Sequence, residues 1–508
     1  MKRILLFHFA LALLLSCSKE APMGRSDDTD TLEPGTTFFA VISEDTKTSF
    51  SPVAEGYKIF WSSGDRISIG GKEYLLSSGA GTQEGRFGPV SEEASAPYKA
   101  IYPASIRVSD TQVTLPATQD YVQGSINAYP LYAESSTTDL SFGSLCGVLR
   151  ITVSGVGFIQ SLTLSADQSL TGTADLSTAK GDKFPHATAS GGKDTLNIQF
   201  ATPLSISSAK QILVSLPVND YTGFKLCFTN TKGYTARRSA TGTISIKRAK
   251  ISDMRFENFT FDRWNDHRFV DLNLPSDLRW AAWNLGATLP QERGDYYAWG
   301  ATEPYYTSLS PLAWKSGKGN GYVLSNAPYY NGFTYTKYTV QGAVLESSDD
   351  AAIAAWGEKF RLPTESEWRE LIGNCYWQYA DSYRSTGISG FIVFKAKAGA
   401  DKGYRQWTSG GAAPSALSYD AGLDANIFLP VAGYFDGKTL TDQSTSAYYF
   451  TASVSDPKWK DADLLTSNAC VLYFNPNDLS NRFEKGCYER FYGFSLRPVI
   501  EKSADESK

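Results

Sequence analysis

The side chains that most often carry catalysis or bind metals are scarce in this chain of 508 residues. Histidine occurs three times, as His8, His186 and His267. These histidines are too few for a metal site built from several histidine ligands, and they make a catalytic triad that depends on histidine improbable. No P-loop or dinucleotide fingerprint occurs in its required setting, and no nucleophile–base pair can be assigned. The sequence predicts a protein that is not an enzyme and that uses no metal and no cofactor.

Cysteine offers one chemical site and several structural residues. No Cys-x-x-Cys occurs, which excludes the common zinc and dithiol redox patterns. Cys146 and Cys227 lie within apolar, strand-like runs, so we expect them in the core. Cys470 and Cys487 could form a disulfide, but the sequence does not establish it. The five cysteines beyond Cys17 are an odd number, so at least one thiol stays out of any disulfide.

The N-terminus predicts export and lipid attachment. Met1-Lys2-Arg3 precedes an apolar run from Ile4 to Leu15 that is too short to span a bilayer, so residues 1–17 read as a signal peptide. Leu14-Leu15-Ser16-Cys17 resembles a bacterial lipobox, which implies a diacylglyceryl thioether on Cys17 and cleavage before it. The alternative is an ordinary signal peptide with an accidental cysteine. The polar residues 18–35 are predicted to be a flexible tether.

Large aromatic side chains divide the chain and supply the candidate ligand-binding residues. Ten of the eleven tryptophans follow residue 263, which marks a boundary between two kinds of domain. Tyrosine and tryptophan suit sugar rings and protein surfaces alike. In a stretch rich in Gly, Ser and Asn, we expect Trp314, Tyr329 and Tyr330 to bind an extracellular glycan or protein. The alternative is that these rings stabilise long loops.

Two helices and several strands are expected to position these rings. Thr364 is a good N-cap and Glu367 completes a capping box, so a helix begins there. A short helix is expected after Asp349-Asp350, ending at Gly357. Apolar runs predict core strands at residues 391–394, 427–429 and 448–450. Together these elements predict an α+β domain.

Five motifs in this region match one family in one order. They are residues 280–287 (WAAWNLGA), 294–300 (GDYYAWG), 360–368 (FRLPTESEW), 428–434 (FLPVAGY) and 492–499 (YGFSLRPV). Residues 263–499 thereby resemble the FISUMP family, whose members are C-type-lectin-like domains of bacterial surface proteins. Trp264-Asn265-Asp266 is similar to a calcium-binding motif of lectins, but it opens the domain instead of falling late in it. We therefore expect no calcium site there.

The first half of the chain predicts β-sandwiches. Short alternating runs such as Leu149–Val153, Ile212–Leu216 and Phe224–Phe228 are broken by turn residues, and no long helical period interrupts them. We expect two transthyretin-like sandwiches, at residues 36–140 and 141–262. With the C-terminal domain and a polar tail at 500–508, the predicted fold is mainly β.

An ordered set of motifs in this half resembles the fimbrillin family of pilins. The matching pieces are residues 38–40 (FFA), 47–48 (KT), 60–67 (FWSSGDRI), 98–103 (YKAIYP), 115–121 (LPATQDY) and 145–150 (LCGVLR). The resemblance implies export as a lipoprotein, proteolytic removal of the first strand near Thr36–Ser43, and filling of the vacated groove by a neighbouring subunit's strand. Cleavage would fall at Lys47, or alternatively at Arg25. An ordinary turn role for Lys47 stays open.

One departure shapes the functional prediction. Stalk fimbrillins donate their C-terminal strand, whereas this chain continues into more than 200 further residues. We therefore expect a cell-surface adhesin, at a fimbrial tip or accessory position, on the outer membrane of a Gram-negative bacterium. The alternative is a monomeric outer-membrane lipoprotein that binds glycan. A net charge of −5 and a pI near 5.5 give no support to nucleic acid as a partner.

Overall fold

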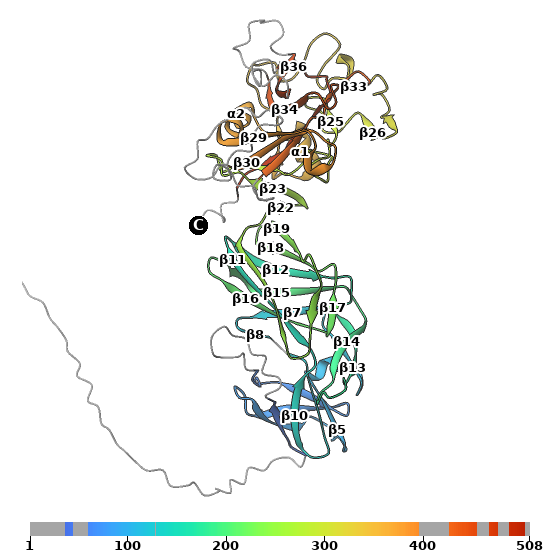
Figure 1. The fold of residues 1–508 in the computed structure, drawn as a ribbon, viewed down its shortest axis with the longest axis vertical. Coiled ribbons are helices and arrows are strands. Elements are labelled where there is room, and N and C mark those ends of the chain that lie inside the picture. The colour runs from blue at the N-terminus through green and yellow to red at the C-terminus, as the bar shows by residue number, and fades with distance from the viewer. Residues whose placement is uncertain are drawn as a thin grey trace, which may run out of the picture.

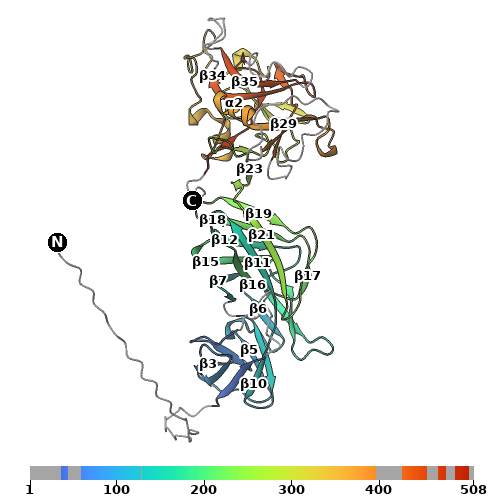
Figure 2. The ribbon, with the colours of Figure 1, turned by 60° about the vertical axis from the view of Figure 1, so that its left-hand side comes forward.

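A computed structural model describes residues 36–43, 59–126, 129–395, 426–454, 467–475 and 487–502. These residues form a mainly β protein with two α-helices, so the predicted fold class is confirmed. The molecule is elongated, with a β-barrel at one end, a β-sandwich in the middle and a C-terminal module at the other end (Figures 1 and 2). Within the described parts, no helix has the length and apolar character needed to cross a lipid bilayer.

Seven strands close the N-terminal barrel in the order β1-β10-β9-β5-β2-β3-β4. Their inward side chains alternate with outward ones, and Phe38, Trp61, Ile67, Phe87 and Phe142 are buried together. The first predicted strand therefore exists, as β1. The strands are β1 (Phe38–Ile42), β2 (Arg66–Ile69), β3 (Lys72–Ser78), β4 (Glu84–Pro89), β5 (Tyr98–Tyr102), β9 (Leu131–Ser135) and β10 (Asp139–Ser144).

The middle sandwich packs a three-stranded sheet, β16-β11-β21, against part of an eleven-stranded sheet. Leu149 and Ile151 of one sheet share a core cluster with Leu162 and Leu226 of the other. The three-stranded sheet contains β11 (Gly147–Gly155), β16 (Lys210–Leu216) and β21 (Ile251–Phe259). The facing strands are β7 (Thr118–Val122), β8 (Ser125–Ile126), β12 (Phe158–Ser165), β15 (Thr195–Ser205), β18 (Lys225–Asn230) and β19 (Thr235–Ser239).

The barrel and the sandwich share strands. β6 (Gln112–Leu115) pairs with β13 (Gly172–Ser177), and β7 pairs in parallel with β15. Strands before residue 140 thus lie in sheets with strands after it. Smaller sheets complete this half, with β14 (His186–Gly191) beside β13, and β17 (Asn219–Tyr221) paired with β20 (Ile244–Ile246).

The eleven-stranded sheet runs without a break from the sandwich into the C-terminal module. β19 pairs with β22 (Arg263–Trp264), and β22 forms a hairpin with β23 (His267–Asp271). Asn265 and Asp266 are the two turn residues of this hairpin, with φ of 44° and 65°, a backbone conformation that Asn and Asp tolerate well. The sheet continues through β24 (Arg279–Ala281), β38 (Val499–Ile500) and β28 (Phe360–Arg361).

Short sheets and two helices build the module. One sheet has the order β25-β37-β34-β35-β36, and another is β29-β30-β31. The predicted core strands at 391–394, 427–429 and 448–450 are confirmed within them. The remaining strands are β25 (Tyr296–Tyr297), β26 (Tyr306–Leu309), β27 (Leu312–Trp314), β29 (Cys375–Ala380), β30 (Gly390–Lys395), β31 (Asn426–Pro430), β32 (Tyr434–Asp436), β33 (Thr439–Thr441), β34 (Ala447–Val454), β35 (Asn468–Phe474), β36 (Cys487–Glu489) and β37 (Phe494–Ser495).

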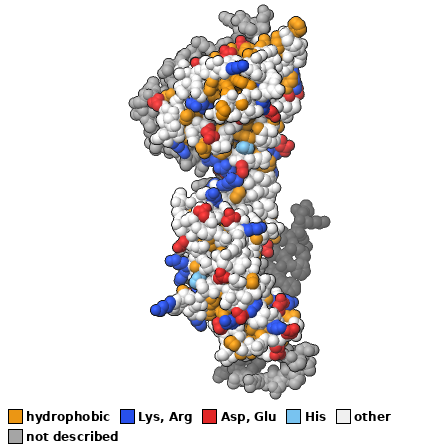
Figure 3. All heavy atoms as spheres, turned by 90° about the vertical axis from the view of Figure 1, so that its right-hand side faces the viewer, with side chains coloured by type: hydrophobic (Ala, Val, Ile, Leu, Met, Phe, Trp, Pro, Cys, Tyr) orange, Lys and Arg blue, Asp and Glu red, His pale blue; other side chains and the backbone are white. Residues whose placement is uncertain are grey.

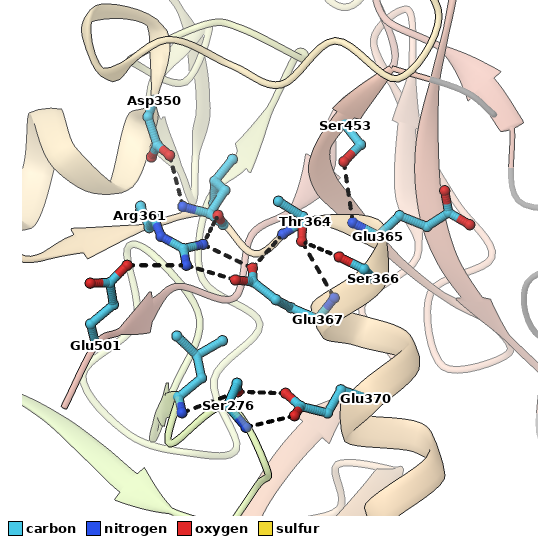
Figure 4. A network of polar contacts seen from close by, with 12 residues as sticks. Ser276, Asp350, Arg361, Thr364, Glu365, Ser366, Glu367, Glu370, Ser453 and Glu501 are labelled. Carbon is cyan, nitrogen blue, oxygen red and sulfur yellow. Dashed lines mark hydrogen bonds and ion pairs between the residues drawn. The ribbon is translucent and has the colours of Figure 1, made fainter.

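Both predicted helix starts are confirmed. The carboxylate of Asp350 accepts hydrogen bonds from the first turn of α1 (Ala351–Trp356), and Gly357 ends that helix with a φ of 96°. In α2 (Glu365–Asn374), the Thr364 hydroxyl accepts from the Glu367 amide at 3.4 Å, while the Glu367 carboxylate accepts from the Thr364 amide at 2.8 Å. Arg361 donates two hydrogen bonds to the same carboxylate, which ties α2 to β28 (Figure 4).

Candidate functional site

The first candidate site is the place of β1 in the barrel. β1 has five residues and lies between β10, to which it is parallel, and β4, to which it is antiparallel. Its inward side chains, Phe38, Ala40 and Ile42, are buried. The Phe38 ring meets Tyr74 and Tyr98 edge-on, with ring centroids 5.0 and 4.7 Å apart. This one strand therefore completes both the hydrogen-bonded ring of strands and the aromatic core.

We call the space that β1 fills between β4 and β10 the seat of β1, and this seat has a defined shape. Ala40 stands opposite Gly85 of β4, and an added Cβ at Gly85 would come within 2.9 Å of Trp61 and 2.7 Å of Leu76. Large side chains thus already fill the space at the middle of the seat, while its ends hold Phe38 and Ile42. A strand in this seat needs a bulky residue, then a small one, then an aliphatic one, at alternate positions.

The residues tied to processing lie outside the described residues. Cys17 and Arg25 precede them, and Lys47 follows β1 in the segment 44–58. Lipidation at Cys17 and cleavage at Lys47 or Arg25 stay predictions.

The second candidate site is a hollow of about 580 Å³ in the C-terminal module. Its apolar part includes Tyr296 and Phe435, which are buried, and Leu309 and Leu312, which are each 39% exposed. The polar part includes amide, carboxylate, guanidinium and ammonium groups. These polar residues are Gln291, Glu292, Arg293, Lys438 and Gln443.

Tyrosine hydrogen bonds hold the inner wall of the hollow. The Tyr296 hydroxyl donates to the Ala432 carbonyl at 2.6 Å, and the Tyr296 amide donates to the Tyr306 hydroxyl at 2.8 Å. The Tyr306 hydroxyl donates in turn to Asp295 at 3.0 Å. Burial raises the pKa of Asp295 against the opposing effect of that hydrogen bond. The wall is thus fixed before any ligand arrives, which lowers the entropy cost of binding.

The rim combines polar groups with exposed leucines. The Glu292 carboxylate accepts hydrogen bonds from the amides of Thr288 and Leu289, which fixes its loop. Arg293 Nη2 lies 3.4 Å from the Ser444 hydroxyl, and the buried Arg293 Nε has no hydrogen-bond partner within the described part of the chain. The hairpin of β26 and β27, which carries Leu309 and Leu312, lies at the right of Figure 1. Hydrophobic side chains gather on the module in the face that Figure 3 presents.

The structure separates Trp314 from the other two predicted ligand-binding residues, the adjacent Tyr329 and Tyr330. Trp314 is half-buried, and its ring packs edge-on against Phe435 at 5.7 Å and Tyr322 at 6.0 Å. It therefore supports the wall of the hollow through Phe435. Tyr329 packs against Tyr338 at 5.8 Å in a different cluster, so the structure does not bring it together with Trp314.

The sequence reasoning missed the most exposed aromatic ring of this region. Tyr330 and Tyr335 pair across a turn, with ring centroids 5.5 Å apart, and Phe333 at the turn is 93% exposed. The Asn331 side chain accepts from the amides of Phe333 and Thr334, both at 2.9 Å, and so holds the turn. The signal available in the sequence was Asn331-Gly332, a strong turn dipeptide, directly before Phe333. The residues of the hollow come from four distant segments and had no such signal.

The composition of the hollow is that of a small-ligand site. Apolar walls with a few polar groups at the rim are typical of small-ligand sites, and the volume lies within the usual range for them. Elsewhere, among the described residues, no group of three or more His, Cys, Asp or Glu side chains is placed to hold a metal ion.

Comparisons with known proteins give remote structural likenesses only. No family model matches the chain, and no curated protein matches it in sequence. A candidate cell adhesion protein from Bacteroides uniformis is 16% identical over 46% of this chain and 94% of its own, with a TM-score of 0.28. The C-terminally truncated tip fimbrial protein Mfa3 from Porphyromonas gingivalis is 10% identical over 45% and 96%, with a TM-score of 0.19. A fimbrial protein from Bacteroides ovatus is 8% identical over 92% and 98%, with a TM-score of 0.23. Scores this low do not carry an argument about fold or function.

Proposed function

We propose that this protein is a cell-surface adhesin that takes a tip or accessory position in a fimbria. In this proposal the barrel accepts a strand from a neighbouring subunit, and the C-terminal module binds a glycan or protein. The resemblance of the first half to fimbrillins motivates the first part, and the hollow in the module motivates the second.

The observation that carries the proposal is the way in which β21 is joined to the C-terminal module. This nine-residue strand pairs in parallel with β11, and the chain then passes through the buried Phe259 and Phe261 into β22 of the continuous sheet. The last strand of the sandwich is therefore held along its length by β11 and at its C-terminal end by the link to the module. A subunit built this way cannot release β21 to a neighbour without breaking its own junction with the module. It is suited to accept a strand and not to give one, which is what a terminal position requires.

The seat of β1 defines the strand that it would accept. If cleavage removes β1, the backbone groups of β4 and β10 that now pair with it become free, and an incoming strand can pair with both. That strand needs the pattern of Phe38, Ala40 and Ile42. We therefore expect the donor to carry a small residue between two bulky apolar ones, each two positions away.

A replacement experiment tests this part of the proposal. The full chain is cleaved after Lys47, and a fluorescent peptide with the sequence of residues 36–43 is added. We expect stable binding of that peptide. A peptide with Ala40→Leu should bind much more weakly because Trp61 and Leu76 already fill the space. A peptide with Val41→Leu, altered on the outward face, is the matched control. Equal binding of all three peptides would contradict the proposed seat.

A monomeric lipoprotein that binds glycan is the second candidate. It is favoured by the closed barrel, which is complete with the chain's own β1 and needs no partner strand. It differs from the adhesin proposal in one observable, because its N-terminal segment would stay attached and lipidated at Cys17. Ligand binding at the hollow would be common to both.

A further inference from the structure

Two cysteines occupy opposite positions on neighbouring strands of the C-terminal module. The register of β35 and β36 pairs Cys470 with Cys487, although the two residues lie 17 positions apart in the chain. β36 is the last strand in the order β25-β37-β34-β35-β36, and it has three residues. The sequence left the pairing of these cysteines open, whereas the backbone of the sheet brings the two residues together.

The hydrogen bonds between the strands show which kind of position the cysteines occupy. In an antiparallel pair, hydrogen-bonded positions alternate with positions that are not hydrogen-bonded. The Arg490 amide donates to the Ser467 carbonyl at 3.1 Å, so these two residues form a hydrogen-bonded position. Three residues further along the same register, Cys470 and Cys487 form a position that is not hydrogen-bonded. Cα atoms at such a position lie about 4.5 Å apart, within the range of roughly 4.4–6.8 Å that a disulfide spans.

Cys470 is in its reduced form in the structure, and its side chain is 5% exposed. Its Sγ lies 3.4 Å from Glu365 Oε2 and 3.5 Å from the Val454 carbonyl oxygen. A thiol is a weak hydrogen-bond donor, so the loss of these contacts on oxidation costs little. Because the residue is buried, a disulfide at this position is shielded from external reductants.

We propose that Cys470 and Cys487 are oxidised to a cross-strand disulfide when the chain is exported. The predicted signal peptide directs the chain to a compartment in which disulfides form and persist. The oxidant is a protein that carries a reactive disulfide. The thiolate of one cysteine attacks that disulfide to give a mixed disulfide, and the thiolate of the other cysteine then releases the oxidant as a dithiol. One S–S bond forms in this chain and one breaks in the oxidant, which takes up the two electrons and two protons of the thiols.

The proposed disulfide holds the strand that leads to Arg490. This side chain is 1% exposed, and its guanidinium donates to the Lys337 carbonyl at 3.1 Å and to the Tyr338 carbonyl. The same guanidinium lies over the rings of Trp299 and Tyr335, at 4.8 and 4.7 Å from their centroids. Arg490 therefore fastens the end of β36 to two other segments of the module.

Three residues of pairing at a sheet edge are a weak support for this contact, because short edge strands open easily. A cross-link between β35 and β36 closes the loop that joins them and so lowers the entropy of the opened state. The disulfide thereby keeps Arg490 in place, and with it the Tyr335 side of the turn that exposes Phe333. This inference does not depend on fimbrial assembly and holds equally for a monomer.

Peptide mapping of the full exported chain tests the pairing. The chain is produced in a bacterial periplasm, denatured with iodoacetamide present so that all thiols are alkylated, and digested with trypsin. The digestion places the two cysteines on separate peptides, residues 461–482 and 486–490, because basic residues lie between them. We expect these peptides to be joined, with a mass two hydrogen atoms below their sum, and to separate on reduction. Alkylation of Cys470 and Cys487, or linkage of Cys470 to a different cysteine, would overturn the proposal.

Hydrogen exchange tests what the disulfide does. Closure of a loop of this size should slow exchange of the β36 amides, so reduction should lower their protection about a hundredfold. Cys487→Ser should show the same fall and no further response to reductant. Cys227→Ser is the matched control, because Cys227 is half-buried on β18 opposite Thr163 and Arg237, and this variant should keep both the linked peptides and the response. Unchanged protection on reduction, or an equal response to reductant in Cys487→Ser and the unchanged protein, would overturn this role.

Discussion

The seat of β1 makes a quantitative prediction about barrel stability. Phe38→Ala removes a ring that is fully buried and that meets Tyr74 and Tyr98 edge-on. Replacement of a buried phenylalanine by alanine costs about 3–5 kcal/mol, and each aromatic pair adds about 0.5–1.5 kcal/mol to simple burial. We therefore expect a loss in the upper part of the 3–5 kcal/mol range. The neighbouring Phe39→Ala is the matched control, since Phe39 lies on the other face of the same strand near Arg86.

Hydrogen exchange of the amides in β4 and β10 is the suitable assay, because these strands flank β1. If opening of β1 exposes them, protection should fall by about three orders of magnitude or slightly more in Phe38→Ala, at about 1.4 kcal/mol per factor of ten. Phe39→Ala should change protection by less than about tenfold. Equal effects of the two substitutions would refute the register of β1, and with it the inward pattern that we assign to a donor strand.

Three further predictions concern the module. Thr364→Ala removes the N-cap of α2 and should lower the free energy of unfolding by about 1 kcal/mol in urea titrations, with no effect expected from Ser366→Ala beyond a few tenths. Burial raises the pKa of Asp349, but hydrogen bonds led by that from Lys337 outweigh it and lower the pKa from 3.8 to about 2. The ionised Asp349 should therefore stabilise the fold fully above pH 4, and this stabilisation should be lost as the pH falls toward 2. In Asp349→Asn, the melting temperature should consequently fall less steeply between pH 4 and pH 2 than in the unchanged protein. An equally steep fall in both proteins would contradict the hydrogen bonds assigned to Asp349. Leu312→Asp, at the rim of the hollow, should abolish binding to a glycan array without lowering the melting temperature, whereas Leu324→Asp, equally exposed and outside the hollow, should leave binding intact.

Local chemistry made part of the fold predictable. The capping box of Thr364 and Glu367 and the Asp350–Gly357 limits of α1 depend on residues three to seven apart, so the sequence contains all the information needed. The same holds for the apolar runs at 391–394 and 427–429, whose burial requires only that some sheet covers them. Strand partners are different, because β6 and β7 pair with strands beyond residue 170, and no periodicity reveals a partner.

The candidate site in the module was harder to predict for the same reason. The hollow joins the loop at 291–294, the β26–β27 hairpin, Ile388 and the β32–β33 hairpin, which are far apart in the chain. Aromatic composition pointed to the region of the hollow, since Trp314 packs against Phe435, which lines it. It could not tell a supporting ring from an exposed one, and the exposed ring is Phe333.

The most direct test of the adhesin account is the N-terminus and assembly state of the protein taken from intact cells. Mass spectrometry identifies the first residue, and denaturing gels of unheated samples reveal strand-exchanged complexes. The account predicts a start directly after Lys47, which removes β1, and a ladder of high-mass complexes that contain other subunits and one copy of this chain. A lipidated start at Cys17 with a single band, or a uniform filament made of this chain alone, would contradict it.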